Sequence, residues 1–263
     1  MTDNLLNFSA ILDSNTPYVV ELIGGPMDGK VLDLITFSDH TLTVAETLSA
    51  ASFILYQIRA VPRLSEVINP QDMATVDDFN PDHGDLVLIP SGGGQFDEYF
   101  YSSHSGHAGF FNATTGLPED PLLHYIQSSY YLRRGTSPFV LVVTGQVKSK
   151  NTLLAVTDTF NYVGSAYPTG TLGDTGLEDF LKPGDPTTAD IIWLQDPSGQ
   201  YERYYYSDGT YAWGVGWRLV DAPPGYEDAD QKNVWIYSGM IIQRRAATPY
   251  DALLTPPYYY SQS

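Results

Sequence analysis

The side chains best suited to binding an ion lie in the loop GYEDADQKN, in the second half of the chain. Glu227, Asp228 and Asp230 bring carboxylate oxygens close together there, and such hard oxygen ligands are the ones that calcium prefers. The spaced ligand pattern of an EF-hand loop is absent. A chain with 31 Asp and Glu residues against 13 Lys and Arg also forms acidic, solvated loops without any ion. The sequence therefore favours a solvated loop and no cofactor, with a calcium site at Glu227, Asp228 and Asp230 as the alternative.

Two histidines have a spacing that could suit zinc. The stretch SSHSGHAG contains His104 and His107 in a His-x-x-His pattern. Imidazole pairs can bind zinc, but a zinc site needs further ligands, and none has suitable local spacing. The matching loop in the second half reads SDGTYAWG and has no histidine. These features favour a solvated hairpin loop over a metal site.

The sequence contains no recognisable catalytic motif. Asp97, Glu98 and Glu202 lie in strand-like segments and could be compared with the carboxylate pair of a glycosidase. Neighbouring residues of a strand point to opposite faces, so Asp97 and Glu98 cannot both flank one bond. PSGGGQ lacks the Lys and the helix of a phosphate-binding loop, and a G-x-S-x-G motif is missing. We therefore expect a protein without enzymatic activity.

The elements that carry these residues occur twice. DLVLIPSGGGQFDEYFYSS begins at Asp85 and DIIWLQDPSGQYERYYYSD at Asp190, and the two align without a gap at an offset of 105 residues. SYYLRRGTSPFVLVVTG aligns with MIIQRRAATPYDALLTP at an offset of 111, which superposes Arg133-Arg134 on Arg244-Arg245. Upstream, VDDFNP pairs with LEDFLKP at an offset of 101. Such a pattern predicts an internal duplication.

The duplication predicts the domain organisation and the fold. We expect an N-terminal extension over residues 1–14, β-rich unit one over 15–145, β-rich unit two over 146–255 and a Tyr-rich tail over 256–263. Short apolar runs such as DLVLI and DIIWL alternate with Gly-rich turns, which is typical of strands. Only PRLSEVI and GDTGLEDFL suggest helical turns, and AETLSAASFILYQI divides into a turn and a strand. The predicted fold is all-β, with two tandem sandwich-like or barrel-like units.

Tyrosine is abundant, with 20 residues, and it clusters on the repeated strands. Alternation places Tyr99 and Tyr101 on one face of the first strand, and Tyr204 and Tyr206 on the equivalent face of the second. Exposed Tyr rings bind partner proteins or stack on sugars, whereas half-buried rings only fill a sheet. Packing within the sheet is the favoured interpretation of these four rings. They are also our candidates for an interface, with sugar stacking as a further alternative.

A second set of tyrosines follows the second unit in the segment TPPYYYSQS. Pro256 and Pro257 cannot donate to a sheet ladder and favour an extended backbone. Tyr258, Tyr259 and Tyr260 are therefore predicted to dock on a neighbouring subunit, because buried aromatic anchors dominate interface energies. This interpretation predicts that the protein binds itself, as a homo-oligomer, a filament or a layer.

Two segments resemble a known family. NYVGSAYPTGTLGDTGL is similar to the N-x-x-G-x-x-Y-P segment of an uncharacterised, paralogous family of secreted β-rich surface proteins from Verrucomicrobia-like bacteria. VVELIGGPMDGKVLDL resembles the SGPxxG segment of the same family, and the likeness extends over about residues 17–255. The resemblance implies export and a β-rich module, and it implies no active site.

Charge and composition narrow the partners and the compartment. The net charge of −18 repels phosphate backbones, which excludes nucleic acid as an expected partner. Cysteine is absent, and no apolar run approaches the ~20 residues of a transmembrane helix, so we expect neither disulfides nor membrane insertion. The segment MTDNLLNFSAILDSNTP has no signal-peptide pattern, which fits a processed form or a protein not exported by that route.

These observations favour a non-catalytic structural protein that assembles with itself on a bacterial cell surface or in an extracellular filament or layer. The expected location is accordingly extracellular or at the cell surface. A structural component of a phage virion is one alternative. A carbohydrate-binding module that recognises a cell-surface glycan is the other.

Overall fold

The computed structural model describes residues 1–48, 55–135, 148–167, 169–196, 198–210, 214–222, 228–234 and 239–256. These residues form seventeen strands, β1 to β17, and only short helical segments. The helical segments are α1 (Phe8–Ile11), α2 (Leu64–Val67), η1 (Pro70–Asp72), η2 (Pro81–His83), η3 (Leu172–Asp174) and η4 (Leu177–Asp179). The predicted all-β class with short helical turns is confirmed. None of the described helices is long and apolar enough to cross a membrane.

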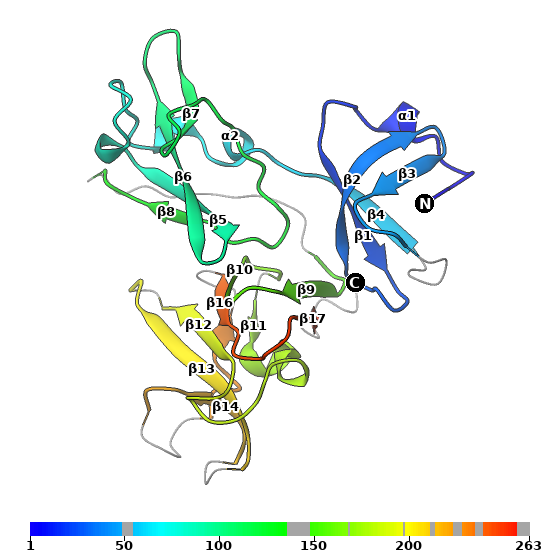
Figure 1. Ribbon diagram of the computed structural model, residues 1–263, viewed down its shortest axis with the longest axis vertical. Coiled ribbons are helices and arrows are strands. Elements are labelled where there is room, and N and C mark those ends of the chain that lie inside the picture. The colour runs from blue at the N-terminus through cyan, green and yellow to red at the C-terminus, as the bar shows by residue number, and fades with distance from the viewer. Residues whose placement is uncertain are drawn as a thin grey trace.

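The first sheet has the strand order β3-β2-β1-β4 and is antiparallel throughout (Figure 1). Its strands are β1 (Tyr18–Ile23), β2 (Val31–Ser38), β3 (Thr41–Val44) and β4 (Leu55–Ala60). The predicted N-terminal extension packs on this sheet. Phe8 is fully buried in its core, and the Met1 amino group donates to Leu42 O at 2.8 Å.

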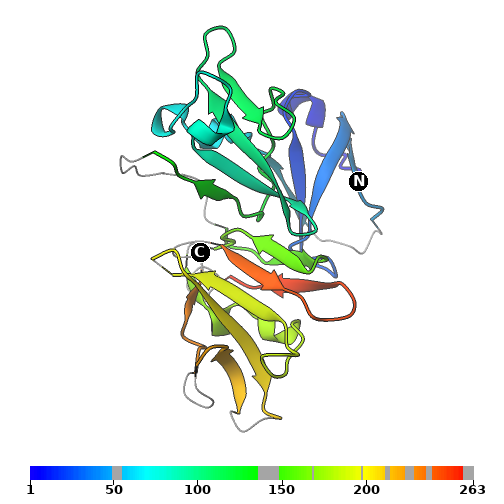
Figure 2. The ribbon, with the colours of Figure 1, turned by 60° about the vertical axis from the view of Figure 1, so that its left-hand side comes forward.

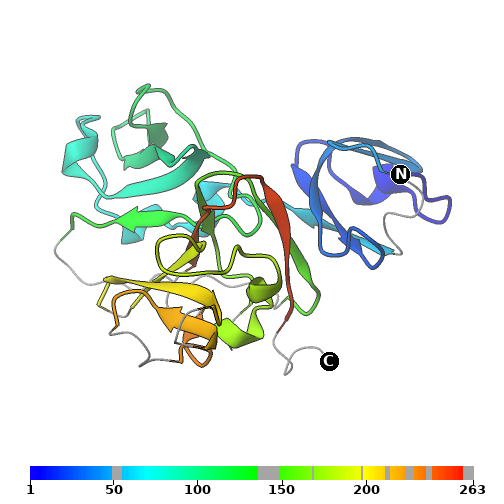
Figure 3. The ribbon, with the colours of Figure 1, turned by 60° about the horizontal axis from the view of Figure 1, so that its bottom comes forward.

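The second sheet has the strand order β7-β6-β5-β8. Its strands are β5 (Leu86–Gly92), β6 (Gln95–Ser102), β7 (Gly109–Asn112) and β8 (Tyr130–Leu132). One face is covered by α2 and the turns after it, and the resulting core contains Leu64, Ile68, Met73, Val87, Ile89, Tyr99 and Phe110. The residues predicted as unit one therefore hold two sheets with separate cores, and Figure 3 shows the first sheet standing apart from the second.

The third sheet has the strand order β10-β16-β12-β13-β14. Its strands are β10 (Phe160–Val163), β12 (Ile191–Gln195), β13 (Tyr201–Asp208), β14 (Val215–Leu219) and β16 (Met240–Gln243). Two strand pairs accompany it: β9 (Thr152–Val156) with β17 (Tyr250–Leu254), and β11 (Gly170–Thr171) with β15 (Asn233–Val234). Together with η3 and η4 they enclose the largest core cluster of the described chain, in which Trp217 and Ile242 are fully buried.

The second and third sheets are built in the same way. In the β5–β6 hairpin Val87 pairs with Tyr99, and in the β12–β13 hairpin Ile192 pairs with Tyr204, so both members shift by the predicted 105 residues. The strands β8 and β16 occupy the same edge of these hairpins, and β7 and β14 the other. Gly94 and Gly199 both have a left-handed backbone, with φ of 77° and 84°, as their turns require. The predicted equivalence of the two hairpins is confirmed.

A buried aspartate precedes each hairpin and fixes the segments around it. Asp85 is fully buried and accepts four hydrogen bonds. The donors are Arg134 N at 2.6 Å, Gly135 N at 2.9 Å, Ala74 N at 2.9 Å and Tyr131 OH at 2.7 Å. Burial alone would raise the pKa of Asp85, but these hydrogen bonds outweigh it and hold the pKa below its ordinary value.

Asp190 makes the same set of contacts in the third sheet and is also fully buried. Its donors are Arg245 N, Ala246 N at 2.9 Å, Lys182 N at 3.0 Å and Tyr250 OH at 2.9 Å. A buried carboxylate is tolerated only when its oxygens are paired, and here each oxygen accepts two bonds. Each aspartate therefore joins the segment before its hairpin to the strand after it.

These contacts correct the alignment upstream of the hairpins. Ala74 N and Lys182 N are equivalent donors, and Val76 N binds Tyr101 O as Gly184 N binds Tyr206 O, each at 3.1 Å. The offset there is 108 residues. The pairing of VDDFNP with LEDFLKP at an offset of 101 is therefore wrong. The two segments align in sequence because both contain Asp-Phe. The equivalent hydrogen bonds are made by backbone N–H groups, which do not require similar side chains at the equivalent positions.

The first sheet is joined to the segment that precedes β9 by a buried ion pair. Glu21 of β1 is almost fully buried and contacts both Lys148 Nζ and Arg59 Nε, the latter at 3.1 Å. Close by, Asn151 Nδ2 donates to Asp28 Oδ2 at 2.7 Å. Burial lowers the pKa of Lys148, although Glu21 opposes the shift. The pair links segments far apart in the sequence, and the predicted boundary between residues 145 and 146 lies outside the described residues.

Candidate binding groove

An open groove lies between the second and third sheets. Its volume is about 410 Å³. The residues that line it are Leu88, Phe96, Tyr130, Tyr131, Leu132, Tyr162, Tyr201 and Ile241. Figure 1 and Figure 2 show how β5 and β8 face β10, β12 and β16 across this region. All the lining side chains are aromatic or aliphatic, so the groove carries no formal charge although the whole chain carries −18.

The alternation of side chains along the strands explains why these residues reach the groove. Leu88 lies between Val87 and Ile89, which both belong to the core of the second sheet. In the third sheet, Ile241 is followed by the fully buried Ile242 of the core. Neighbouring strand residues point to opposite faces. Most of the groove is therefore formed by the face of each sheet that is turned away from its main core. On that face Leu88 also packs against a smaller buried cluster of Val76, Leu86, Phe100 and Phe111.

Backbone contacts between the two sheets hold the groove open in a defined shape. Gln127 forms a β-bridge with Val163, and Ser128 N donates to Tyr162 O at 3.3 Å. The Gln127 side chain donates to Pro90 O at 2.7 Å and so ties the same segment to β5. Ile126 has a positive φ of 58°, an uncommon conformation for a branched residue. The surrounding contacts thus fix the groove before any ligand binds.

Four aromatic rings form a rigid cluster along the groove. Phe96 lies edge-on to Tyr162 and Tyr130, with ring centroids 4.8 Å and 5.5 Å apart. Tyr130 and Tyr162 are also nearly perpendicular, at 6.0 Å, and Tyr201 OH donates to Tyr130 OH at 3.1 Å. Edge-to-face pairs of this kind are favourable beyond the area they bury. Burial, and then the hydrogen bond from Tyr201, raise the pKa of Tyr130, so its hydroxyl stays neutral.

A more polar hollow adjoins the aromatic groove. It measures about 270 Å³, and Tyr130, Tyr131, Tyr201 and Ile241 line both spaces. Its other lining residues are Ser128, Ser129, Gln195, Gly239 and Met240. A mostly apolar surface with a few hydrogen-bonding groups at one end is the usual composition of a ligand site.

The tyrosines predicted as interface residues lie on the other face. Tyr99 and Tyr204 are buried in the cores of the second and third sheets, and Tyr101 and Tyr206 pack partly against the same cores. This part of the prediction is corrected: α2, η3, η4 and their loops cover that face, which periodicity alone could not show. The rings available to a partner come from the alternate face, on which Phe96 and Tyr201 are placed by the same two-residue period. Tyr258, Tyr259 and Tyr260 lie outside the described residues.

The acidic loop predicted to bind calcium has other partners. Asp228 Oδ1 accepts a hydrogen bond from Asp230 N at 3.0 Å and lies 3.8 Å from Arg218 Nη1. Asp230 Oδ1 accepts from Trp217 N at 3.0 Å. Glu227 lies outside the described residues. Across the described ranges, no group of three or more His, Cys, Asp or Glu side chains is arranged to hold a metal ion.

The two histidines of the His-x-x-His pattern pack around an aromatic ring. Phe79 lies 5.1 Å from His104 and 6.2 Å from His107, measured between ring centroids. His104 Nδ1 is 2.7 Å from Asp77 O, so a ring nitrogen that could bind zinc is engaged with the backbone. Phe79 itself has a positive φ of 58°. The arrangement is that of a packed loop.

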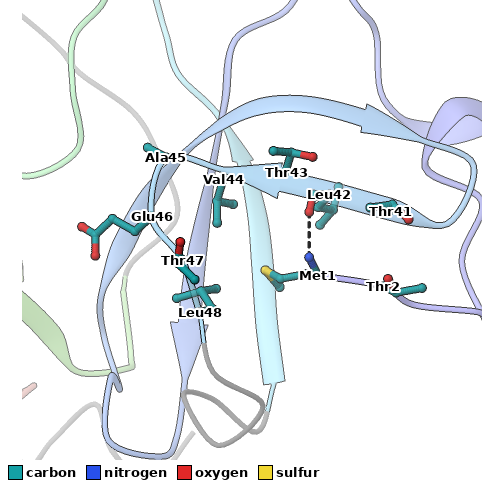
Figure 4. A pocket seen from close by; sticks show the side chains of 10 residues that line it. All are labelled: Met1, Thr2, Thr41, Leu42, Thr43, Val44, Ala45, Glu46, Thr47 and Leu48. Carbon is teal, nitrogen blue, oxygen red and sulfur yellow. Dashed lines mark hydrogen bonds between the residues drawn. The ribbon is translucent and has the colours of Figure 1, made fainter.

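A further hollow of about 670 Å³ opens beside β3 in the first sheet, and Figure 4 shows its lining from Met1 and Thr2 to Leu48. The hydrogen bond from the Met1 amino group to Leu42 O crosses one side of it. Residues 49–54, which follow Leu48 directly, lie outside the described part of the chain, so we place no site there.

No protein-family model, no curated protein and no solved structure matches this chain. Fold and groove together define an all-β protein with two similar sheets, whose outward faces meet at an uncharged aromatic surface.

Proposed function

We propose that the protein is a non-catalytic structural protein that associates with copies of itself at a bacterial cell surface or in an extracellular filament or layer. The observation that carries this proposal is the uncharged aromatic groove between the second and third sheets. Its rings are held in place by one another and by backbone pairing, so binding costs little ordering of the groove. Exposed apolar surfaces of this kind mark interaction sites.

The charge of the chain favours a contact of this type. Two copies with a net charge of −18 repel each other at long range, and the groove is a place where they can meet without bringing carboxylates together. Screening shortens the range of that repulsion to about 8 Å at physiological salt. Association should therefore strengthen as salt rises, opposite to the behaviour of a contact made by ion pairs.

Sedimentation velocity and negative-stain electron microscopy of the full chain test this proposal. We expect concentration-dependent oligomers that grow with salt. Leu132→Glu places a charge in the groove at a side chain that is 45% exposed, and it should weaken association without unfolding the sheet. Leu117→Glu, at a leucine that is 64% exposed and does not line the groove, is the matched control. A chain that stays monomeric at high concentration and at every salt level would contradict the proposal.

A carbohydrate-binding module is the second candidate, favoured by the polar hollow beside the rings. Ser128, Ser129 and Gln195 offer hydrogen-bonding groups next to Tyr130 and Tyr201, and sugars present both hydroxyls and apolar faces. Screening on a glycan array, with Tyr201→Ala for comparison, separates the two candidates. Glycan binding by a monomer that is lost in Tyr201→Ala would favour the module.

A further inference from the structure

We infer that the aromatic groove receives the segment Thr255–Ser263 of a second copy of the chain. This inference rests on the proposed self-association and names the two surfaces that meet. The groove offers rings without charge, and the segment TPPYYYSQS has no charged side chain, although the chain as a whole carries 31 Asp and Glu residues. No side chain of either surface therefore has to be buried as an unpaired charge when they meet.

The place where the described chain ends argues for a second copy rather than the same one. Thr255 N lies 3.5 Å from Thr175 O, between η3 and η4. Leu172 of η3 and Leu177 of η4 are fully buried in the core of the third sheet. The groove residues Tyr162 and Ile241 are on the opposite face of that sheet from this core. The segment after Thr255 therefore starts on the side turned away from its own groove.

The chemistry of the segment suits an aromatic groove. Consecutive prolines favour the polyproline II conformation, which rises ~3.1 Å per residue and forms no internal hydrogen bonds. Such segments dock in grooves lined by aromatic side chains, because they are ordered before binding. The open, aromatic groove of about 410 Å³ has the composition that this binding mode requires. The Tyr residues after the prolines add rings that can pack against Phe96, Tyr130 and Tyr201.

A contact between the segment of one copy and the groove of the next joins two different surfaces. Such a contact is heterologous, and each bound copy still presents a free groove or a free segment at its end. Unless the rotation between copies closes a ring, the product is an open filament. The inference thus specifies head-to-tail growth, whereas a two-fold dimer would be formed by the same surface on both copies.

The test mixes two full-length variants. The segment variant carries Tyr258→Ser, Tyr259→Ser and Tyr260→Ser, and the groove variant carries Leu132→Glu. Each alone should lose roughly tenfold or more in association constant, as expected for removal of interface anchors. Mixed in equal amounts, they should form a one-to-one complex that grows no further. The segment of the groove variant binds the groove of the segment variant, and after that contact the complex has no intact groove or segment left to bind a third copy. Leu117→Glu alone is the control and should assemble as the wild-type chain does, because its groove and its segment are both intact.

The outcomes separate this inference from the proposed function. If the wild-type chain assembles and the segment variant assembles equally well, the segment is not the occupant, while self-association stands. A mixture that forms no complex although each variant alone is monomeric also overturns the inference. If the wild-type chain never assembles, the proposed function itself fails. Addition of a synthetic Thr255–Ser263 peptide should shorten wild-type oligomers, whereas a peptide of the same composition with its prolines separated should not.

Discussion

The two buried aspartates show what the second and third sheets share and where they differ. Asp85 and Asp190 each accept four hydrogen bonds. Two come from backbone N–H groups just after β8 or β16, one comes from the segment before the hairpin, and one comes from a tyrosine hydroxyl. The tyrosine differs in origin. Tyr131 comes from β8 itself, whereas Tyr250 comes from β17, a strand outside the third sheet. The position equivalent to Tyr131 is Ile242, which is core.

The comparison indicates that each buried carboxylate requires a hydroxyl donor, and that this donor need not come from the same strand in both sheets. An unfilled acceptor in a buried site costs the desolvation of that group, so the fold must supply a donor from any element within reach. In the third sheet the additional pair β9–β17 supplies it, and Ile242 is then free to fill the larger core. We propose an ancestral duplication in which one donor was exchanged for another.

The largest effect is expected from removing either carboxylate. Asp85→Ala and Asp190→Ala each leave several buried donors without an acceptor, which should lower the free energy of unfolding by about 3–5 kcal/mol. Asp221→Ala is the control, because Asp221 is exposed and pairs only at the surface with Arg203. Denaturant unfolding measures all three. If one of the two variants lost less than about 1 kcal/mol of unfolding free energy and the other did not, the two aspartates would not have equivalent roles.

A smaller effect is expected from removing the hydroxyl alone. Tyr131→Phe and Tyr250→Phe each delete one hydrogen bond to a carboxylate, worth about 1.5–3 kcal/mol, and should destabilise the protein to a similar extent. Tyr18→Phe is the matched control, since its hydroxyl meets only the exposed Asp13 N. Thermal unfolding followed by circular dichroism gives the three values. Clearly unequal losses would show that the two donors are not interchangeable.

Asp85 of the second sheet should contribute to the loss of stability at acid pH. The pKa of Asp85 is lower in the folded state than its ordinary value of 3.8, so its stabilisation is present above that pH and is lost as pH falls through the folded pKa. A single group changes the free energy of unfolding by at most about 1.4 kcal/mol per pH unit. Denaturant unfolding between about pH 5 and 2 should show a shallower pH dependence in Asp85→Asn than in the wild type. Equal slopes would remove Asp85 from the acid response.

The smallest effect is expected at the hairpin turns. Gly94→Ala and Gly199→Ala each force a side chain into a left-handed backbone and should cost about 1 kcal/mol. Gly109→Ala is the control, because a Cβ at Gly109 meets nothing within 4 Å and its φ is not left-handed. Melting temperatures that fall in both turn variants and not in the control would sharpen the equivalence of the hairpins. A change in only one would weaken it.

Much of each hairpin could be predicted before the structure was known. The gapless repeat gave both hairpins their register, because turn and strand pairing depend on residues close in sequence. The buried face could not be predicted in the same way. In QFDEYFYS aromatic rings occur on both faces, so hydrophobic alternation does not distinguish the covered face of Tyr99 from the groove face of Phe96. Only the placement of α2 and the turns after it decides between them.

By itself, then, the sequence determined the all-β class, the two hairpins with their turn glycines, and the presence of an aspartate before each. The tertiary structure alone decided the partners of those aspartates, the separate core of the first sheet and the groove between the other two. The physical reason is the range of the interactions. Strand pairing across a tight turn is local, whereas Tyr250 reaches Asp190 across 60 residues and Tyr201 reaches Tyr130 across 71. Contacts of that range depend on how whole sheets pack, which no single segment encodes.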